Sequence, residues 1–380
     1  MKHPEQVAMI KRLLDLRQTR RDEKMLDEVV RIPVTKYTDQ GLLDRELAAT
    51  FTRYPLVAGH VSALREPGSY LASDWDRFPY IVVRGRDGRI RAFHNQCRHR
   101  GARLVSERSG CVDNFVCPFH GWVYDLDGTL RGITRAHDFP GVDKDEHGLV
   151  EIPATESGGL VWVGRTAEAV ADIPGFLGAF HDDLVDFDVA SLVQYKKTKV
   201  VKEANWKLLI KTYLEGYHVP YLHRTTLASA FKRGVIAWDQ DGPHLRLSAA
   251  RTNIDEVGLK PENEWRILDH VSVYYTLFPN TFFILHPDYV SINTFWPVRP
   301  DRTIWTHEML YRAEDFRGSA GQSALRKRFV FTNDDVFDQE DFAIAEDVQR
   351  MLEHGGSDHH TLGLAEGLLA MFQDTIDNRL

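Results

Sequence analysis

The sequence predicts an α+β protein with a small antiparallel β domain and a larger domain in which helices cover one large antiparallel sheet. Three observations support this prediction. The chain has 380 residues, which is long for a single hydrophobic core. Short apolar runs separated by turn dipeptides fill residues 55–163. After residue 164 helices and strands alternate without the regular βαβ rhythm of a parallel sheet.

The N-terminal 53 residues are predicted to be mainly helical. Apolar residues recur at spacings of three and four from Gln6 to about Val30, which is typical of one or two amphipathic helices. A second short helix is expected from Asp39 to Phe51. The following segment changes to β runs such as Tyr80-Ile-Val-Val, with Asp87-Gly88 and Asp127-Gly128 as turns. This pattern indicates a small antiparallel β domain.

The remaining chain, after a connector that contains proline and glycine, predicts the larger sheet and its helices. The expected strands are Tyr195 to Val201, Val271 to Leu285, Tyr289 to Pro297 and Thr303 to Tyr311, and the expected helices are Asn205 to Tyr217 and Asp335 to Leu352. The aromatic-rich part of this region, Tyr274 to Trp296, is interpreted as core for most of its members, with some contributing to a pocket wall.

Composition excludes several classes of function. The net charge of −8 provides no basic surface for nucleic acid or for an anionic membrane. The most apolar stretch, Tyr274 to Leu285, is much shorter than the roughly 20 residues of a spanning helix, and no targeting segment is recognisable. With only three cysteines, a reducing cytoplasm fits best, and Cys111 is interpreted as a free, buried bystander.

Two pairs of residues predict a metal site in the β domain. Cys97-Arg-His99 and Cys117-Pro-Phe-His120 form the pattern C-x-H-x17-C-x2-H, so that each pair offers one thiolate and one imidazole. Four such ligands suit a [2Fe-2S] cluster in which both imidazoles bind one iron. A structural Cys2His2 zinc site uses the same donors, but its paired ligands usually lie two to four residues apart, and here one residue separates the first pair.

The segment that contains both pairs, from about Tyr54 to Val163, closely resembles a Rieske domain. The resemblance is carried by Cys97-Arg-His-Arg-Gly-Ala-Arg and by Cys117-Pro-Phe-His-Gly-Trp. It implies a [2Fe-2S] cluster held by Cys97, His99, Cys117 and His120.

A second candidate metal site lies in Glu215-Gly-Tyr-His218-Val-Pro-Tyr-Leu-His223. On an unbroken helix the two histidines would point about 140° apart, and Pro220 is expected to break the helix and bring them together. The alternative is a solvated polar stripe of Lys207, Lys211, Glu215 and His218 opposite an apolar face that ends at Tyr217.

Asp341 is the candidate third ligand of this site. It shares the stripe of Ile344, Ala345, Val348 and Leu352, which is expected to face the core, whereas Glu340 falls on another face of the helix. A carboxylate in the core requires a cation or a partner. The alternative role for Asp341 is that of a helix N-cap. Two histidines and one aspartate would form the facial triad of non-haem Fe(II) oxygenases.

Nearly the whole chain resembles the catalytic α subunit of Rieske non-haem iron oxygenases. The resemblance is carried by Asn205-Trp-Lys, Tyr217-His-Val-Pro-Tyr-Leu-His and Asp338-Gln-Glu-Asp341. It implies a Rieske domain at 54–163, a helix-grip (START-like) catalytic domain from 1–53 and 164–380, and a homotrimer in which the cluster of one subunit supplies the iron of its neighbour. Ring-dihydroxylating members commonly have Asp where this chain has Glu215, and relatives that oxidise quaternary ammonium compounds use Glu.

We therefore expect an O2-dependent enzyme that hydroxylates or oxidatively dealkylates a small organic molecule, either an aromatic compound or a methylated amine. Mononuclear Fe(II) would be held by His218, His223 and Asp341, and Glu215 would connect the two metal centres. The sequence contains no dinucleotide fingerprint and no ferredoxin spacing, so a separate NAD(P)H-dependent reductase is implied, with or without a ferredoxin. The alternatives are a Rieske-type electron carrier and a zinc protein that binds small ligands.

Overall fold

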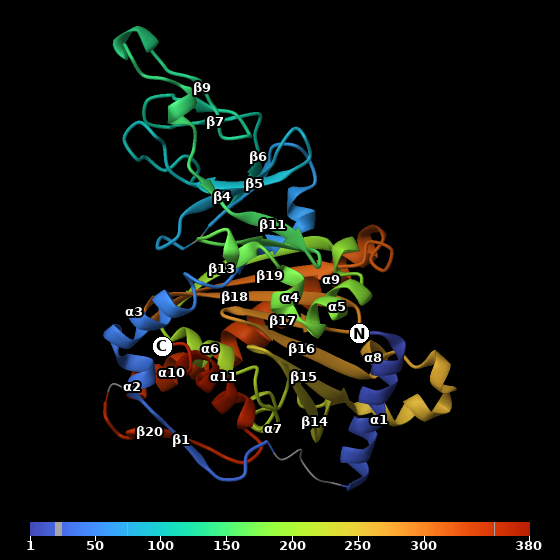
Figure 1. Ribbon diagram of the computed structural model, residues 1–380. Coiled ribbons are helices and arrows are strands. Elements are labelled where there is room, and N and C mark those ends of the chain that lie inside the picture. Colours follow the sequence, from blue (N-terminus) through green and yellow to red (C-terminus); the bar gives the residue numbers. More distant parts are fainter. Residues whose placement is uncertain (20–24, 74, 353) are drawn as a thin grey trace. The chain divides into compact units, whose positions relative to one another are not determined.

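The computed structural model describes residues 1–19, 25–73, 75–352 and 354–380 (Figure 1). The chain divides into two compact units. The larger consists of Met1–Phe51, Phe176–Phe187 and Leu192–Leu380, and the smaller of Thr52–Gly175 and Asp188–Ser191. Their helices and antiparallel sheets confirm the predicted α+β class. Within the part of the chain that the structure describes, no helix combines the length and apolar character that a membrane span requires.

The larger unit is built on one seven-stranded antiparallel sheet with the strand order β13-β19-β18-β17-β16-β15-β14 (Figure 1). Strands β14 and β15 were not anticipated from the sequence. The strands are β13 Val193–Lys202, β14 Phe231–Asp241, β15 His244–Arg251, β16 Val271–Leu277, β17 Thr281–Leu285, β18 Tyr289–Arg299 and β19 Arg302–Tyr311.

The prediction of one strand from Val271 to Leu285 is wrong, because this segment forms a hairpin of two strands, β16 and β17. Pro279 lies in the turn, where its missing N–H removes a donor that a central strand would need. The side chain of Asn280 donates to the Phe295 carbonyl at 3.1 Å, and this bond ties the turn to the neighbouring strand β18. The hairpin doubles the number of strands that this apolar stretch contributes to the sheet.

Helices flank the sheet and its edges. Helix α1 packs against β14, α6 packs against β18, and α10 packs on α6 (Figure 1). The helices of the unit include α1 His3–Thr19, α2 Thr35–Thr38, α3 Gln40–Ala49, α5 Ala179–Asp186, α6 Trp206–Lys211, α7 Val219–Leu222, α8 Ile267–His270, α9 Gly318–Phe329, α10 Phe342–Leu352 and α11 Gly367–Asp377, and α4 Ile173–Leu177 crosses the boundary between the units.

The N-terminal helix ends earlier than predicted. Part of the expected helix up to Val30 lies outside the described residues, and residues 25–30 are not helical. The backbone N–H groups of Met25 and Leu26 donate to the Leu364 carbonyl, and β1 (Val30–Pro33) pairs with β20 (His359–Leu362). Pairing with the distant C-terminal segment therefore overrides the local helical periodicity.

The helix predicted from Asp335 to Leu352 is part of a longer helical run from Gly318 to Leu352. Its middle section, η8 (Val330–Asp341), is a π-helix, which is rare at this length and is frequently found at functional sites. Ile344 is 44% exposed, so the predicted core-facing stripe is wrong at this position, whereas Asp341 and Ala345 are buried. The wider π-helical turns change which residues face the core.

A buried ion pair connects α6 to α3 in the larger unit. Lys207 Nζ donates to Glu46 Oε1, and both side chains are fully buried. Burial raises the pKa of Glu46 and lowers that of Lys207, and the partner opposes each shift. Lys211 is also buried, and its Nζ donates to the Tyr37 hydroxyl at 2.7 Å. These contacts rule out the solvated stripe considered above for this face of the helix.

Glu46→Ala is expected to lower the free energy of unfolding by about 3–5 kcal/mol, because it leaves the Lys207 ammonium buried without its partner. Urea denaturation measures this loss. The double variant Glu46→Leu/Lys207→Met removes both charges and should recover most of the stability. Glu262→Ala is the matched control, since it breaks the exposed pair with Lys11 and should cost about 1 kcal/mol or less. An equally small loss for Glu46→Ala would contradict the assignment.

In the smaller unit the described residues form three antiparallel sheets. They have the strand orders β10-β5-β4-β3-β6, β11-β12-β2 and β7-β8-β9. The predicted turn glycines Gly88 and Gly128 have φ of 78° and 87°, a conformation that glycine adopts without steric cost. The strands are β2 Leu56–His60, β3 Ser69–Ala72, β4 Tyr80–Arg84, β5 Ile90–His94, β6 Ser109–Cys111, β7 Phe115–Val116, β8 Val123–Tyr124, β9 Leu130–Gly132, β10 Glu151–Ile152, β11 Ala154–Ser157 and β12 Leu160–Val163.

Candidate metal centres

Two loops of the smaller unit repeat the same backbone pattern around the cysteines, and we call them the cysteine–histidine loops (residues 97–102 and 117–122). In the first, Cys97 N donates to the Ala102 carbonyl at 2.8 Å and the Cys97 carbonyl accepts from Gly101 N at 2.9 Å. In the second, Cys117 makes the equivalent bonds to Trp122 and Gly121 at 2.8 and 3.0 Å. Gly101 and Gly121 both have positive φ, so each loop turns tightly behind its cysteine.

The four predicted cluster ligands come from these two loops, each of which supplies one cysteine and one histidine. Cys97 and Cys117 are buried free thiols, and the rings of His99 and His120 have centroids 4.6 Å apart. The Nδ1 atoms of both histidines are buried and have no hydrogen-bond partner among the described residues. Buried imidazole nitrogens without partners are costly unless they bind something, so this donor set fits a metal cluster. The donors alone fit zinc and iron–sulfur equally well.

The surroundings of the loops orient these donors. The Tyr124 hydroxyl lies 3.2 Å from Cys97 Sγ and accepts a hydrogen bond from Arg98 N at 3.0 Å. Burial raises the pKa of the Cys97 thiol, and Tyr124 opposes this shift. The indole of Trp122 stacks on the His99 ring at a centroid distance of 5.0 Å. Hydrogen bonds to ligand sulfurs and shielding from solvent are the features that tune the potential of a bound cluster.

Cys111 is not part of this centre. It lies in β6 opposite Ser69, and its side chain is exposed, so the prediction that it is buried is wrong. The strand is short and lies at the edge of its sheet, which leaves the thiol open to solvent.

Cys111→Ser is expected to leave the visible spectrum and the iron content of the purified protein unchanged, because the thiol is exposed and its hydrogen-bond partner among the described residues is the Pro67 carbonyl at 3.6 Å. Absorption spectroscopy and metal analysis check this expectation. Loss of the chromophore in this variant, with wild-type folding, would mean that the ligands are misassigned.

The second group of predicted ligands lies in the larger unit. His218, His223 and Asp341 each offer one ligand atom, and these three atoms lie within 4.8 Å of one another. Asp341 Oδ1 is 3.1 Å from His223 Nε2 and 3.5 Å from His218 Nε2. We call this group the imidazole–carboxylate cluster. Asp341 ends the π-helix and α10 follows directly, so it is not a helix N-cap.

Local structure explains how the two histidines meet. The helix predicted from Asn205 to Tyr217 ends at Lys211, and His218 comes directly before the separate short helix α7. Pro220 therefore lies in the first turn of α7, where its missing N–H is tolerated, and it begins a helix rather than breaking one. His223 follows α7, and the two imidazole centroids are 5.1 Å apart.

Two glutamates form hydrogen bonds with the Nδ1 atoms of these imidazoles, on the side of each ring away from Asp341. Glu215 Oε1 pairs with His218 Nδ1, and Glu340 Oε2 pairs with His223 Nδ1 at 2.6 Å. The hydroxyl of Thr226 also donates to Glu340 Oε2, at 2.7 Å. Partners on Nδ1 fix the tautomer and orientation of a metal-binding histidine and leave Nε2 free as the ligand. This outer arrangement matches the donor set that a mononuclear metal ion requires.

Sequence reasoning missed Glu340 because an α-helical wheel places it on a different face from Asp341. The signal that could have found it is its position directly before a candidate ligand in a segment rich in carboxylates. Burial opposes protonation of His223, but the carboxylates of Asp341 and Glu340 raise its pKa above the ordinary value. Burial raises the pKa of Asp341, and His223 opposes this shift. A bound cation would replace this mutual stabilisation.

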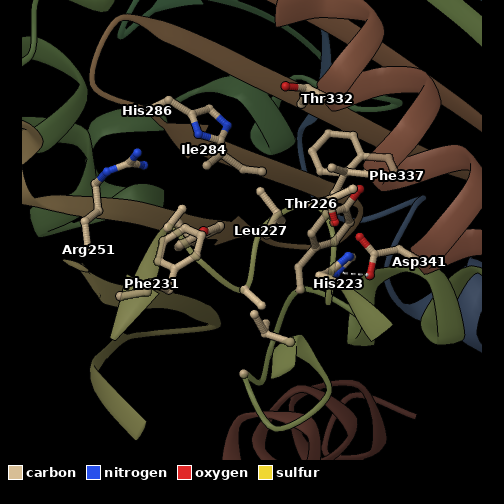
Figure 2. A pocket seen from close by; sticks show the side chains of 18 of the residues that line it. His223, Thr226, Leu227, Phe231, Arg251, Ile284, His286, Thr332, Phe337 and Asp341 are labelled. Atoms are coloured by element: carbon tan, nitrogen blue, oxygen red, sulfur yellow. Dashed lines mark hydrogen bonds and ion pairs between the residues drawn. The ribbon is translucent and has the colours of Figure 1, made fainter. Parts of the chain in front are cut away.

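The imidazole–carboxylate cluster borders a cavity of about 870 Å³. This volume lies within the range of small-molecule sites. Figure 2 shows His223 and Asp341 at one side of the cavity and Arg251 and His286 at the other, with apolar side chains between them. Of the aromatic-rich segment Tyr274 to Trp296, Tyr274 and Tyr289 line the cavity, whereas the interpretation as core holds for residues such as Phe283, Phe295 and Trp296.

Comparison with known proteins identifies both parts of the chain. The family described as "Ring hydroxylating alpha subunit (catalytic domain)" matches residues 189–380, and the Rieske [2Fe-2S] domain matches residues 55–143. The glycine betaine monooxygenase oxygenase subunit of Chromohalobacter salexigens is 36% identical over 200 residues, which are 52% of this chain and 44% of that protein. The match therefore spans less than half of this relative.

Two further comparisons cover most of the chain. The corresponding Pseudomonas aeruginosa subunit is 28% identical over 363 residues, 85% of this chain and 82% of its own length. The crystal structure of a quaternary ammonium Rieske monooxygenase, studied for carnitine oxidation and inter-subunit electron transfer, superposes with a TM-score of 0.79 at 22% identity, covering 92% of this chain and 95% of that one. This last likeness is one of fold. The chain belongs to the family of ring-hydroxylating oxygenase α subunits and carries the Rieske [2Fe-2S] domain of that family.

Proposed function

We propose that this protein is the oxygenase component of a Rieske system that hydroxylates or oxidatively dealkylates a small organic molecule. The observation that carries the proposal is the imidazole–carboxylate cluster at the border of a cavity, in a chain that also presents the cysteine–histidine loops. A Rieske-type electron carrier would need no such cavity. A zinc protein that binds small ligands would not explain the match to the ring-hydroxylating family.

In this proposal Cys97, His99, Cys117 and His120 hold the [2Fe-2S] cluster. His218, His223 and Asp341 hold mononuclear Fe(II). The functional division would follow residues 54–163 for the Rieske domain and 1–53 with 164–380 for the catalytic domain. When bound, the cluster supplies single electrons and the ferrous iron supplies the chemistry of O2 activation.

The contribution of the chain is to orient these groups and to shape the cavity. Glu215 and Glu340 accept hydrogen bonds from the two Nδ1 atoms, so both Nε2 atoms face Asp341. Leu227, Ile284 and Phe337 form apolar wall between the two sides of the cavity (Figure 2). Such a wall excludes water from the side where a substrate reacts and strengthens the electrostatic interactions within it.

We further propose a homotrimer in which electrons pass between subunits. Support comes from exposed aromatic side chains beside both centres: Phe119 is 55% exposed next to His120, and Tyr217 and Tyr221 are 68% and 59% exposed near His218. Exposed aromatic groups of this kind are enriched in protein interfaces. A protein of the same fold has been studied for inter-subunit electron transfer.

The electron donor is proposed to be a separate NAD(P)H-dependent reductase, with or without a ferredoxin. The substrate is proposed to be a methylated or quaternary amine or an aromatic compound. Relatives named for glycine betaine and carnitine favour the first class, as does the glutamate at position 215. The three free cysteines fit the proposed reducing cytoplasm.

Metal analysis and absorption spectroscopy of the purified protein test the proposal. We expect about three irons per chain, two in the cluster and one at His218, His223 and Asp341, with the visible spectrum of a Rieske centre. Two irons per chain would favour the electron carrier. A colourless, zinc-containing protein would overturn the proposal.

A further inference from the structure

The cavity beside the imidazole–carboxylate cluster has an uneven distribution of charge. Three carboxylates line it within the described part of the chain. Glu215 and Asp341 belong to the metal side. The third, Asp288, forms an ion pair with Arg328 Nη2 and is therefore neutralised. Within the described residues, none of these three carboxylates forms an ion pair with the further positive charge on the other side.

Such a charge is present in Arg251, the last residue of β15. Its guanidinium has no carboxylate partner among the described residues. It makes only a 3.4 Å contact to Ser272 Oγ and lies 5.7 Å from the ring centroid of Phe231. The other lining cations are on the exposed rim or already paired, since Lys232 binds Asp255 at 3.2 Å. Arg251 is thus the cation of the cavity that is available to an anion.

Two nitrogen atoms of the cavity lining near Arg251 are also open to a ligand. His286 Nε2 and Arg328 Nε are buried and have no partner in the residues that the structure describes. The His286 ring is held in place by stacking on Tyr289 at a centroid distance of 4.1 Å. Burial and the positive charge of Arg251 lower the pKa of His286 to about 3, so the ring is neutral and can donate from one nitrogen only.

Figure 2 places Arg251 and His286 on the side of the cavity opposite His223 and Asp341. We propose that Arg251, His286 and Arg328, which we call the arginine end, bind a carboxylate of the substrate and leave the rest of the molecule directed at the imidazole–carboxylate cluster. A guanidinium and a carboxylate form two parallel hydrogen bonds, and this geometry orients as well as binds.

This proposal narrows the substrate to organic acids. It rests on the proposed function, because that function places the oxidised group of the substrate at the imidazole–carboxylate cluster. Both betaines and aromatic acids can carry a carboxylate at one end and an oxidisable group at the other. A cavity of about 870 Å³ accommodates a ligand considerably larger than glycine betaine. Neutral hydrocarbons and amino alcohols would leave the arginine end without a partner, which costs binding energy.

Calorimetric titration of the metal-loaded protein with matched pairs of ligands tests the proposal. The probes are glycine betaine, 4-(trimethylammonio)butanoate and 4-methoxybenzoate, each paired with its carboxamide. We expect at least one carboxylate to bind about ten- to a hundredfold more tightly than its amide. Arg251→Gln should remove this preference, and Arg251→Lys should retain part of it because the charge remains.

Two further variants make the result specific to the arginine end. His286→Phe keeps an aromatic ring against Tyr289 but removes Nε2, and it should weaken carboxylate binding several-fold. This variant tests the arginine end independently of whether Arg251→Gln folds. Arg233→Gln is the matched control, since Arg233 lines the same cavity but is exposed and donates to the Tyr221 hydroxyl at 3.1 Å. It should leave the preference unchanged.

Equal binding of every acid and its amide by the wild-type protein would overturn the proposal, and so would an unchanged preference in both Arg251→Gln and His286→Phe. Because calorimetry does not depend on turnover, failure of the oxygenase function has a different signature. In that case carboxylates would still bind in preference to amides, but no bound acid would support O2 consumption with a reductase.

Discussion

Asp341→Ala is expected to abolish oxygenation and to lower the iron content by one per chain, while the visible spectrum of the cluster stays intact. The carboxylate is buried 3.1 Å from His223 Nε2 and is the only acidic member of the imidazole–carboxylate cluster. Without it two imidazoles remain, which is too few ligands to hold Fe(II) firmly. His218→Ala should have the same effect. Iron analysis, absorption spectroscopy and O2 consumption measure the three quantities.

Asp347→Ala is the control for this prediction. Asp347 lies on the neighbouring helix α10, is exposed, and pairs only with Arg350 in the described structure. Its loss should leave both metals and turnover unchanged. Asp341→Ala protein that kept all three irons, or that lost the cluster and retained the single iron, would show that the two ligand sets are wrongly divided.

Glu215→Gln is expected to slow reoxidation of the cluster about tenfold to a hundredfold during a single turnover with substrate and O2. Glutamine can still accept hydrogen bonds from the backbone of Tyr217 and His218 through its carbonyl, so the local fold should persist. Its amide nitrogen cannot accept a hydrogen bond from an imidazole. In the proposed trimer Glu215 would connect His218 to His120 of the partner subunit, and this connection would be lost.

Stopped-flow absorption at the cluster band measures the reoxidation. Both metals, trimer assembly and reduction by the external reductase should match the wild type. Glu340→Gln provides the comparison, because it perturbs His223 in the same way but has no proposed contact with a ligand of the [2Fe-2S] cluster. Normal reoxidation in Glu215→Gln would show that this carboxylate only orients His218.

The parts of the fold that could be predicted are those that depend on short stretches of sequence. The cysteine–histidine loops are an example, because each contains its ligands, its glycine and its turn within six residues. The hairpins at Gly88 and Gly128 are another. Each is marked in the sequence by an Asp-Gly dipeptide, which favours a turn whatever the rest of the chain does, and both glycines have the expected positive φ. The α+β class and the antiparallel sheet followed from patterns of the same short range.

The parts that could not be predicted depend on contacts between distant residues. From sequence alone, Lys207 and Lys211 fit a solvated polar stripe. In the structure both are buried, and they bind Glu46 of α3 and Gln373 of α11. The early end of α1 depends on β20, more than 300 residues away along the chain. Arg251 and His286 have ordinary neighbours in sequence, and only the folded sheet brings them to one side of a cavity.

Because Asp341 is the last residue of the π-helix η8, its orientation depends on the number of residues in η8 as well as on their identity. Consecutive residues at its end, Glu340 and Asp341, reach the two opposite nitrogens of the single ring of His223. Removing one residue anywhere within η8 would rotate Asp341 about the helix axis relative to α9. Every ligand would still be present in such a chain, yet the carboxylate would no longer face the imidazoles. The number of residues between α9 and α10 therefore determines whether Asp341 can coordinate the same metal ion as the two histidines.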